Sequence, residues 1–220
     1  MIYQKVRTGQ RIYRRYLKHN GLNMTDAIHT IHQRHSVRRF QEKPISKNHI
    51  QIILDAANRA PSAHNQQSWK FIIIEDDKKQ GLADLVSKAA KAFDRPANSL
   101  LRMAGRSIQS APTVIAVANT GELIEHGSEL FKVNAGLARD FFRTMEIQSS
   151  AAAVENMLLA ATSLGLGTVW LGILYLIKDE VLQFLNEPAG EFMAVVPVGF
   201  PARASKGPGK KPLDNVVKAL

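Results

Sequence analysis

The segment from Ile147 to Leu164 constrains the fold most, because it predicts a helix that is apolar nearly all round. Such a helix has to be buried on every side, either in a core or against another subunit. Small residues such as Ser149, Ala153 and Ala161 crowd it, and their size permits close approach of a neighbouring element. We therefore expect this helix to lie centrally and to contact a partner chain.

The rest of the chain predicts a mixture of helices and strands, with no linker that would divide the 220 residues. β-branched and aromatic runs indicate strands, and apolar residues at helical spacing indicate helices. We expect strands at 69–74, 112–118, 168–171 and 192–200, and helices at 25–34, 46–60, 78–92, 147–164 and 177–185, with another after the loop 94–96 and a loop or short helix within 119–136. Pro197 predicts that the last strand lies at a sheet edge or a bulge.

The composition excludes several classes of site. Cysteine is absent, so disulfides, thiolate catalysis and cysteine-ligated zinc or iron–sulfur centres are excluded. No apolar run approaches the roughly 18 residues of a membrane-spanning helix, and no signal core is present, so we expect a cytoplasmic protein without a membrane span. His29, His32 and His35 recur at three-residue spacing without an obvious carboxylate partner, and we expect no metal site. The cluster Glu122, Glu125, His126 and Glu129 could form a metal or acid/base site, but a surface loop is the favoured interpretation.

Basic residues gather at the start of the chain. Residues 1–23 contain six Lys or Arg and no acid, out of a net charge of +10. We expect a basic N-terminal extension, 1–23, before the main domain, 24–220. An arm that binds nucleic acid or an anionic membrane is an alternative interpretation, but the nearly balanced charge of the remaining residues argues against a nucleic-acid partner.

A cationic stretch follows the first expected helix. Arg34 and Arg38 place two guanidinium groups around the hydroxyl of Ser36, close to backbone amides at a helix end, and this combination suits a phosphate monoester. His35 is expected within the same turn. A solvated basic turn is the alternative.

A second polar stretch follows the second expected helix. Pro61 stops that helix, and Ser62, Asn65 and Gln67 then offer hydroxyl and amide groups. Groups of this kind can hydrogen-bond the carbonyls and ring nitrogens of a planar heterocycle.

Taken in order, these stretches resemble the nitroreductase family of FMN-dependent oxidoreductases, together with 156–172 and 196–202. The resemblance covers 24–220. It implies an α+β nitroreductase-like fold with a central, mostly antiparallel sheet of four to five strands, flanked by helices. It also implies a domain-swapped homodimer with FMN at the interface, in which the loop from Pro61 to Asn65 comes from the other subunit.

The resemblance implies a role for each candidate. Arg34, Ser36 and a basic residue near the C-terminus hold the FMN phosphate, Arg38 faces the N1/O2 edge of the ring, and the backbone from Trp170 to Gly172 offers an N–H to N5. The expected cofactor-binding residues are Arg34, His35, Ser36, Arg38, Pro61, Ser62, Ala63, Asn65, Gln67, Trp170, Leu171, Gly172, Lys210 and Lys211. No catalytic side chain is expected, because the chemistry belongs to the flavin.

The function implied by the resemblance is ping-pong hydride transfer. NADH or NADPH reduces bound FMN through N5, and an oxidised acceptor such as a nitroaromatic or a quinone then takes the hydride. Two alternatives remain: a flavoprotein that uses FMN as a sensor or structural ligand without turnover, and a basic module that binds nucleic acid or membrane.

Overall fold

The computed structural model describes residues 26–130, 134–187 and 189–219. The basic extension 1–23 and the expected N-cap Thr25 lie outside the described residues. The chain divides into two compact units, which we describe separately. The larger unit comprises residues 36–204, and the smaller unit comprises the described residues 26–35 and 205–219.

The larger unit is built on a four-stranded antiparallel sheet in the order β1-β2-β4-β3. Its strands are β1 (Trp69–Ile74), β2 (Thr113–Asn119), β3 (Gly167–Thr168) and β4 (Glu191–Gly199). Every residue of β2 is buried, because this strand is interior to the sheet and helices cover both faces. The expected α+β fold with an antiparallel sheet is confirmed.

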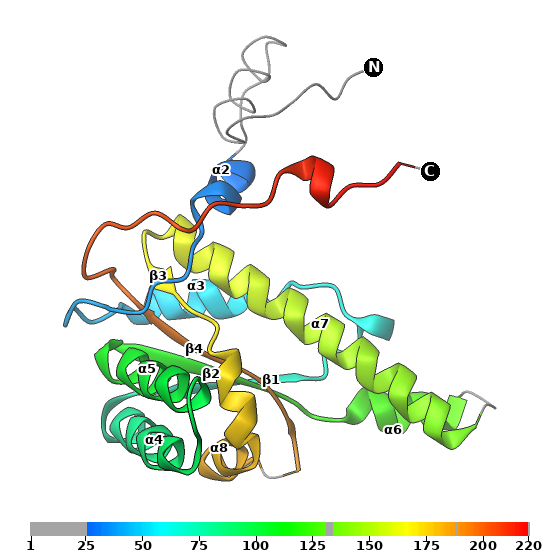
Figure 1. The fold of residues 1–220 in the computed structure, drawn as a ribbon. Helices are drawn as coiled ribbons and strands as arrows, with labels where there is room; N and C mark the ends of the chain where they lie inside the picture. The colour runs from blue at the N-terminus through cyan, green and yellow to red at the C-terminus, as the bar shows by residue number, and fades with distance from the viewer. Residues whose placement is uncertain (1–25, 131–133, 188, 220) are drawn as a thin grey trace. The chain divides into compact units, whose positions relative to one another are not determined.

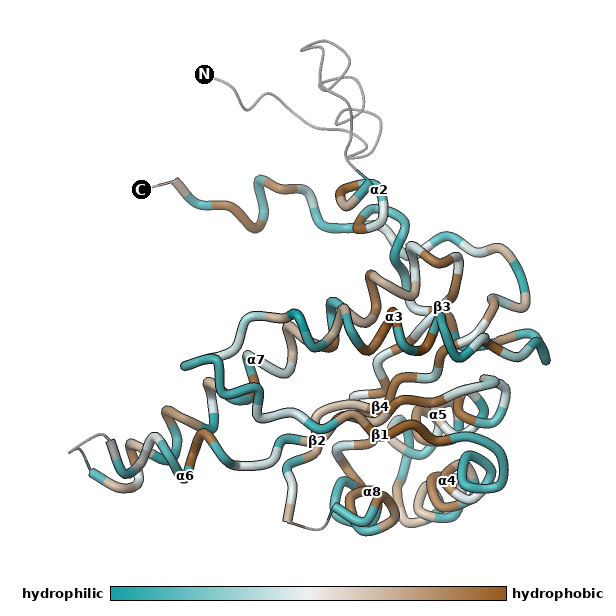
Figure 2. The backbone as a smooth tube through the Cα atoms, turned by 180° about the vertical axis from the view of Figure 1, so that it is seen from behind, coloured by the Kyte–Doolittle hydropathy of each residue, from teal (hydrophilic) through white to brown (hydrophobic). Residues whose placement is uncertain are grey.

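Helices pack on both faces of this sheet (Figure 1). α3 (Lys47–Asn58) and α7 (Ala135–Ser163) lie on one face, and α4 (Asp76–Ala89), α5 (Ala97–Ser110) and α8 (Lys178–Phe184) lie on the other. Alternate residues of β2 therefore enter different cores: Ile115 packs with α3 and α7 residues, whereas Val114 packs with α4 and α5 residues. Figure 2 shows hydrophobic colouring along much of the central sheet, consistent with its packing between helices.

Local signals account for several of the boundaries. The expected N-cap of α3 is confirmed, since the Ser46 hydroxyl oxygen accepts the N–H of His49 at 3.2 Å. The region 119–136 contains α6 (Glu122–Leu130), and short 3₁₀ segments occur at Ala63–Asn65 (η1), Ala90–Ala92 (η2) and Gly172–Ile177 (η3).

Among the helices of the described residues, none combines the length and hydrophobicity needed to cross a membrane.

The helix α7 differs from its prediction in length and in burial. It begins at Ala135, well before Ile147, because Asn134 caps it by accepting the N–H groups of Gly136 and Leu137. Within this chain it buries one face rather than all faces: Phe142 is buried, whereas the neighbouring Phe141 is 45% exposed and Leu137 is 61% exposed. Burial on every side is therefore not achieved by a single chain.

The expectation that Pro197 places this strand at a sheet edge is wrong, and the pairing irregularity that β4 does contain lies away from Pro197. β4 lies between β2 and β3, and the irregularity in its pairing falls opposite Val117 and Ala118. The Val195 carbonyl accepts the N–H of Leu171, so Val195 presents its polar groups to the β3 side. The backbone groups of Pro197 face the same side as those of Val195, because residues two apart in a strand have the same orientation. The proline is tolerated because β3 is short and ends at Thr168, opposite Val198.

The smaller unit joins the two ends of the described chain. It contains α2 (Asp26–Gln33) and a C-terminal segment with the 3₁₀ turn η4 (Leu213–Asn215). The His35 ring is bonded to the Gln33 carbonyl at 3.0 Å and to the Ser205 hydroxyl at 2.9 Å. Gly207 packs so closely on His35 that an added Cβ would lie 2.7 Å from the His35 Cβ. His35 thus fixes the C-terminal segment within this unit.

Candidate functional site

The cationic stretch becomes extended from Ser36 onward. Ser36 forms a parallel bridge with Thr168, and the N–H of Val37 donates to the Thr168 carbonyl at 2.8 Å. Val37 is buried, while Ser36 and Arg38 are exposed on either side of it. Because alternate residues of an extended chain face the same side, the structure presents Ser36 and Arg38 together at the edge of the sheet.

Two contacts hold Val37 and Arg38 in place within the larger unit. The buried hydroxyl of Ser107 on α5 donates to the Arg38 carbonyl at 3.1 Å. On the other side, Gly167 allows close approach, because an added Cβ there would lie 2.7 Å from Val37 side-chain carbons. The backbone is therefore positioned by buried contacts, and the Arg38 side chain remains exposed.

The other basic candidates belong to the smaller unit. Arg34 and His35 follow α2 and are half-buried, and Lys210 and Lys211 lie exposed on the C-terminal segment that His35 binds. Arg34 stands at the C-terminal end of α2, where the unsatisfied backbone groups are carbonyls. The backbone amides that were expected to assist phosphate binding are therefore not offered by this helix end, and the candidate donors in the smaller unit are guanidinium and ammonium groups.

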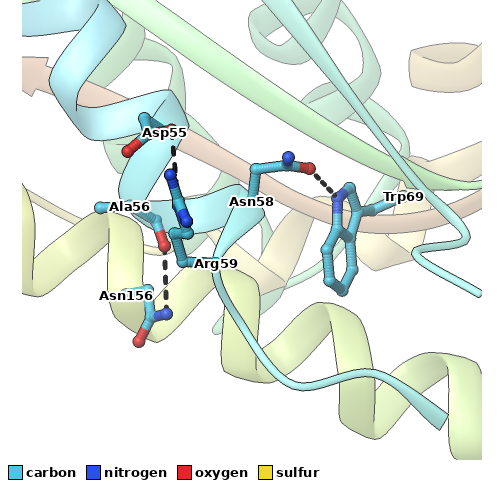
Figure 3. Close-up of polar contacts among 6 residues, drawn as sticks. All are labelled: Asp55, Ala56, Asn58, Arg59, Trp69 and Asn156. Atoms are coloured by element: carbon cyan, nitrogen blue, oxygen red, sulfur yellow. Dashed lines mark hydrogen bonds and ion pairs between the residues drawn. The ribbon is translucent and has the colours of Figure 1, made fainter. Parts of the chain in front are cut away.

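The amide-bearing loop is anchored where it leaves α3 (Figure 3). Asn156 on α7 donates from its side-chain amide to the Ala56 carbonyl at 3.1 Å. The indole N–H of Trp69, at the far end of the loop, donates to the side-chain oxygen of Asn58 at 3.0 Å. The last turn of α3, the central helix α7 and the start of β1 thus hold both ends of the loop.

Between these anchors the loop backbone is strained. His64, Asn65 and Gln67 have φ values of 54°, 53° and 54°, in the left-handed region that non-glycine residues rarely adopt. Such conformations cost about 1–3 kcal/mol each, and they cluster at ligand-binding sites. Sequence inspection did not predict this strain, since asparagine and histidine adopt such a conformation more often than other residues but still uncommonly, and glutamine has no such preference.

Hydrogen bonds maintain the strained conformation. The N–H of Ala63 donates to the Ser149 hydroxyl oxygen on α7 at 3.1 Å, and the N–H of Gln67 donates to the Ser62 hydroxyl oxygen at 3.1 Å. The side-chain amide of Gln67 donates to the Asn65 carbonyl at 3.1 Å. Ser62, Ala63 and Gln67 therefore support the loop itself, and Pro61, Asn65 and Gln67 are exposed.

The segment from Trp170 to Gly172 presents three different environments. Trp170 is half-buried and its indole N–H donates to the Met193 carbonyl at 3.3 Å. Leu171 is buried, and its N–H is already bonded to the Val195 carbonyl at 3.0 Å. Gly172 is exposed, and an added Cβ would meet no atom within 4 Å. Of the three residues, Gly172 offers the backbone that a flat ring can approach.

A hollow of about 420 Å³ adjoins Trp170 and Gly172. Its lining consists of Arg143, Ile147, Trp170, Gly172, Tyr175, Glu191, Phe192 and Met193. Arg143 on α7 forms an ion pair with Glu191 at the start of β4, and the hydrogen bond and charge of Glu191 raise the pKa of Arg143. Sequence inspection missed this pair because the fold alone brings α7 and β4 together.

A buried acid, Glu146, lies on α7 near the end of the loop. It is 1% exposed, and its Oε1 accepts the N–H of Leu123 at 2.9 Å. Burial raises the pKa of the Glu146 carboxyl. The nearby Ser68 hydroxyl opposes this rise in pKa. Its geometry falls short of a hydrogen bond, so Ser68 Oγ and Glu146 Oε2 are buried without a hydrogen-bond partner among the described residues. One turn further along α7, the Ser150 hydroxyl donates to the Asn119 side-chain oxygen, so buried polar contacts connect α7 to β2 and to α6.

Within the described ranges, no group of three or more His, Asp or Glu side chains is arranged to hold a metal ion. The histidines of α2 have other partners: His29 is bonded to the Gln33 side chain at 2.6 Å. The candidate segments instead offer backbone amides, hydroxyls and guanidinium groups, which are groups that suit an organic ligand.

Comparison with known proteins places this architecture in a family. The sequence profile of the nitroreductase family matches residues 31–200. An Archaeoglobus fulgidus protein assigned as an NADH dehydrogenase/NAD(P)H nitroreductase is 30% identical, over 81% of this chain and 87% of its own length. The chain therefore belongs to the nitroreductase family.

Solved structures share the fold. A Desulfovibrio desulfuricans protein, assigned as a nitroreductase and crystallised with FMN, is 26% identical with a TM-score of 0.64, and the match covers 90% of this chain and 98% of that one. NfrA2 of B. megaterium is 23% identical with a TM-score of 0.72, over 89% of this chain and 74% of its own. The recognition of this fold from the sequence is confirmed.

Proposed function

We propose that this protein is an FMN-dependent oxidoreductase that transfers hydride from NADH or NADPH to an oxidised acceptor such as a nitroaromatic or a quinone. Membership of the nitroreductase family supports an NAD(P)H-dependent oxidoreductase, and the FMN-bound relative supports the cofactor. Bound FMN supplies the hydride chemistry, first as acceptor and then as donor in a ping-pong cycle. The protein has to bind the cofactor, orient it and exclude water.

The observation that carries the proposal is the open backbone at Gly172, which adjoins a hollow with apolar walls and one ion pair. A flat ring can approach Gly172 because no atom occupies the space where a Cβ would stand. A neighbouring aromatic, Trp170, lines the same hollow. We propose that the Gly172 amide faces the reactive edge of the isoalloxazine, since the Leu171 amide is already bonded within the sheet.

Polar groups of the larger unit fit the remaining needs of a flavin. The exposed guanidinium of Arg38 is proposed to face the N1/O2 edge, where positive charge stabilises the negative charge that hydride transfer adds. The strained loop, with exposed Pro61 and Asn65, is proposed to meet the ring edge of the flavin held by the partner subunit. Ser36 is proposed as a hydroxyl donor to the phosphate.

The smaller unit supplies cations of the kind that a phosphate requires. Arg34 is proposed to bind the FMN phosphate through its guanidinium, and Lys211 or Lys210 to add an ammonium group. Within this unit the bonds of His35 to Ser205 and to the Gln33 carbonyl fix the C-terminal segment that carries both lysines. His35 is therefore proposed to position these groups.

We also propose a domain-swapped homodimer with FMN at its interface. The exposed Leu137 and Phe141 on α7 provide an apolar face of the larger unit. In the smaller unit, Leu213, Val216 and Val217 are 62%, 61% and 55% exposed. Apolar side chains in a terminal segment are suited to packing on a second copy of the chain. Sedimentation velocity of the wild type and of a Phe141→Lys variant tests this: we expect a dimer that the substitution weakens, and a wild-type monomer would refute it.

Absorbance of the purified protein tests the proposed function. We expect flavin bands that bleach under anaerobic NADH or NADPH and return when a quinone or a nitroaromatic is added. Colour that no nucleotide bleaches would instead favour a sensor or structural flavoprotein. A protein that stays colourless with added FMN, and that binds DNA or anionic vesicles in a salt-sensitive way, would favour the basic module. A cytoplasmic location remains part of the proposal.

A further inference from the structure

We propose that the hollow beside Trp170 and Gly172 binds the carboxamide of the reductant's nicotinamide, with Arg143 as hydrogen-bond donor and Glu191 as acceptor. This inference rests on the proposed function, because it assigns a substrate group to the same site. It adds two residues, from α7 and β4, to which the family resemblance assigned no role.

The shape and lining of the hollow suit a small planar ring. Its volume of about 420 Å³ lies within the usual range for small-molecule sites, and Ile147, Trp170, Phe192 and Met193 provide apolar walls. Because Gly172 lines the hollow and also offers the open backbone proposed for the flavin, a ligand here would adjoin the ring. Adjacency of this kind is what hydride transfer requires.

The polar groups of the hollow restrict which substituent the ring can carry. The Arg143 and Glu191 side chains are 40% and 24% exposed, so a ligand in the hollow can reach both. Their direct contact leaves spare capacity, because a guanidinium has five N–H donors and a carboxylate has about four acceptor positions. The pair therefore presents a donor beside an acceptor.

Electrostatics distinguish between candidate ligands. An anionic substituent would be repelled by Glu191, and a cationic one by Arg143, since both charges lie at the same place. A neutral primary carboxamide satisfies both groups, because its carbonyl accepts from Arg143 and its NH₂ donates to Glu191. Nicotinamide carries this group on a flat ring of suitable size, whereas quinones and simple nitroaromatics have acceptors only.

The test compares NADH with its reduced 3-acetylpyridine analogue, in which a methyl group replaces the carboxamide NH₂. The dissociation constant of each nucleotide is obtained from the concentration dependence of anaerobic flavin bleaching. Equilibrium titration with the non-reducing 1,4,5,6-tetrahydro-NADH provides a second measurement that does not depend on turnover. We expect the wild type to bind NADH about tenfold or more tightly than the acetyl analogue.

Two variants have different expected signatures. Glu191→Ala removes the acceptor of the NH₂ group, so we expect the preference for NADH to fall nearly to one. Arg143→Met removes the donor to the carbonyl, which both nucleotides possess, so we expect both to bind about tenfold or more weakly with the preference unchanged. Two substitutions serve as matched controls. Glu187→Ala removes an acid that precedes β4 and pairs with Lys70, and Arg139→Met removes an exposed arginine one turn before Arg143 on α7. Both controls should retain the wild-type constants.

Several outcomes would overturn the inference. One is a Glu191→Ala variant that keeps the full preference, and another is a change confined to the KM of the acceptor. A variant that fails to fold would lose bound FMN and cooperative unfolding, and Arg143→Met would then decide the question. Failure of the proposed function is distinguishable, because neither nucleotide would then bleach the wild-type flavin. Bleaching without a preference refutes the carboxamide site alone.

Discussion

Replacing Glu146 with glutamine is expected to raise the free energy of unfolding, by an amount that grows with pH. The carboxyl is 1% exposed, and burial raises its pKa above the ordinary value of 4.5, although the bond from the Leu123 N–H opposes the shift. The folded protein then binds more protons than the unfolded chain. Stability therefore falls as the pH rises from 4.5 through the folded-state pKa, and this loss is absent at lower pH.

The size of the effect follows from the same contacts. Glutamine keeps an oxygen that accepts the Leu123 N–H, and it cannot ionise. Above the folded-state pKa it therefore avoids a loss in the free energy of unfolding of about 1.4 kcal/mol for each unit by which the pKa is raised. Glu146→Ala leaves the Leu123 N–H without this acceptor, and we expect it to lower the free energy of unfolding by about 1–3 kcal/mol.

Urea denaturation between about pH 5 and 8, with the FMN content held constant, measures both effects. Glu180→Gln, a substitution of an exposed acid on α8, is the control. The reasoning is refuted if Glu146→Gln has the same effect on stability throughout this range, or if it destabilises the protein more as the pH rises.

Three further substitutions test the candidate site. Gly172→Ala adds a methyl group that meets no atom within 4 Å, so we expect an unchanged Tm of the FMN-free protein and a reduced FMN content; full retention of FMN would contradict the role of Gly172. Gly167→Ala places a Cβ 2.7 Å from Val37, and we expect a loss of about 1–3 kcal/mol in denaturant unfolding that Val37→Ala partly relieves. Arg34→Ala should weaken FMN binding about tenfold or more in a fluorescence titration, whereas Arg39→Ala should not; equal affinities would remove the phosphate role of Arg34.

Much of the secondary structure is predictable because its signals are local. The run 69–74 forms β1 as expected, and Ser46 caps α3 as its side chain predicts. The predicted start of α7, Ile147, lies C-terminal to the observed start at Ala135. Polar residues obscure the hydrophobic periodicity of the first turns, and the N-cap at Asn134 is a signal from one residue only. The prediction for Pro197 was wrong because a proline lacks the backbone N–H. Whether that N–H is needed at this position depends on where the neighbouring strand β3 ends.

The candidate site was predictable only in part. Residues 34–38 and 61–67 are predicted from their chemistry and order, and residues 170–172 from the family resemblance, and the structure shows the contacts that hold each segment. The strain at His64, Asn65 and Gln67 was not predictable, since it is maintained by bonds that include one from Ala63 to Ser149 on α7. The pairing of Arg143 with Glu191 leaves no sequence signal, because ion pairs between distant residues follow no spacing.

By itself, the sequence determined the family, the alternation of helices and strands, and the absence of any cysteine-based chemistry. These properties follow from residue types and short-range periodicity, which the chain carries before it folds. Only the tertiary structure decided that Gly172 rather than Leu171 has an open backbone, and that Glu146 is buried with a raised pKa. The reason is that exposure, pKa and hydrogen-bond partners depend on which segments pack together, and that packing joins residues far apart along the chain.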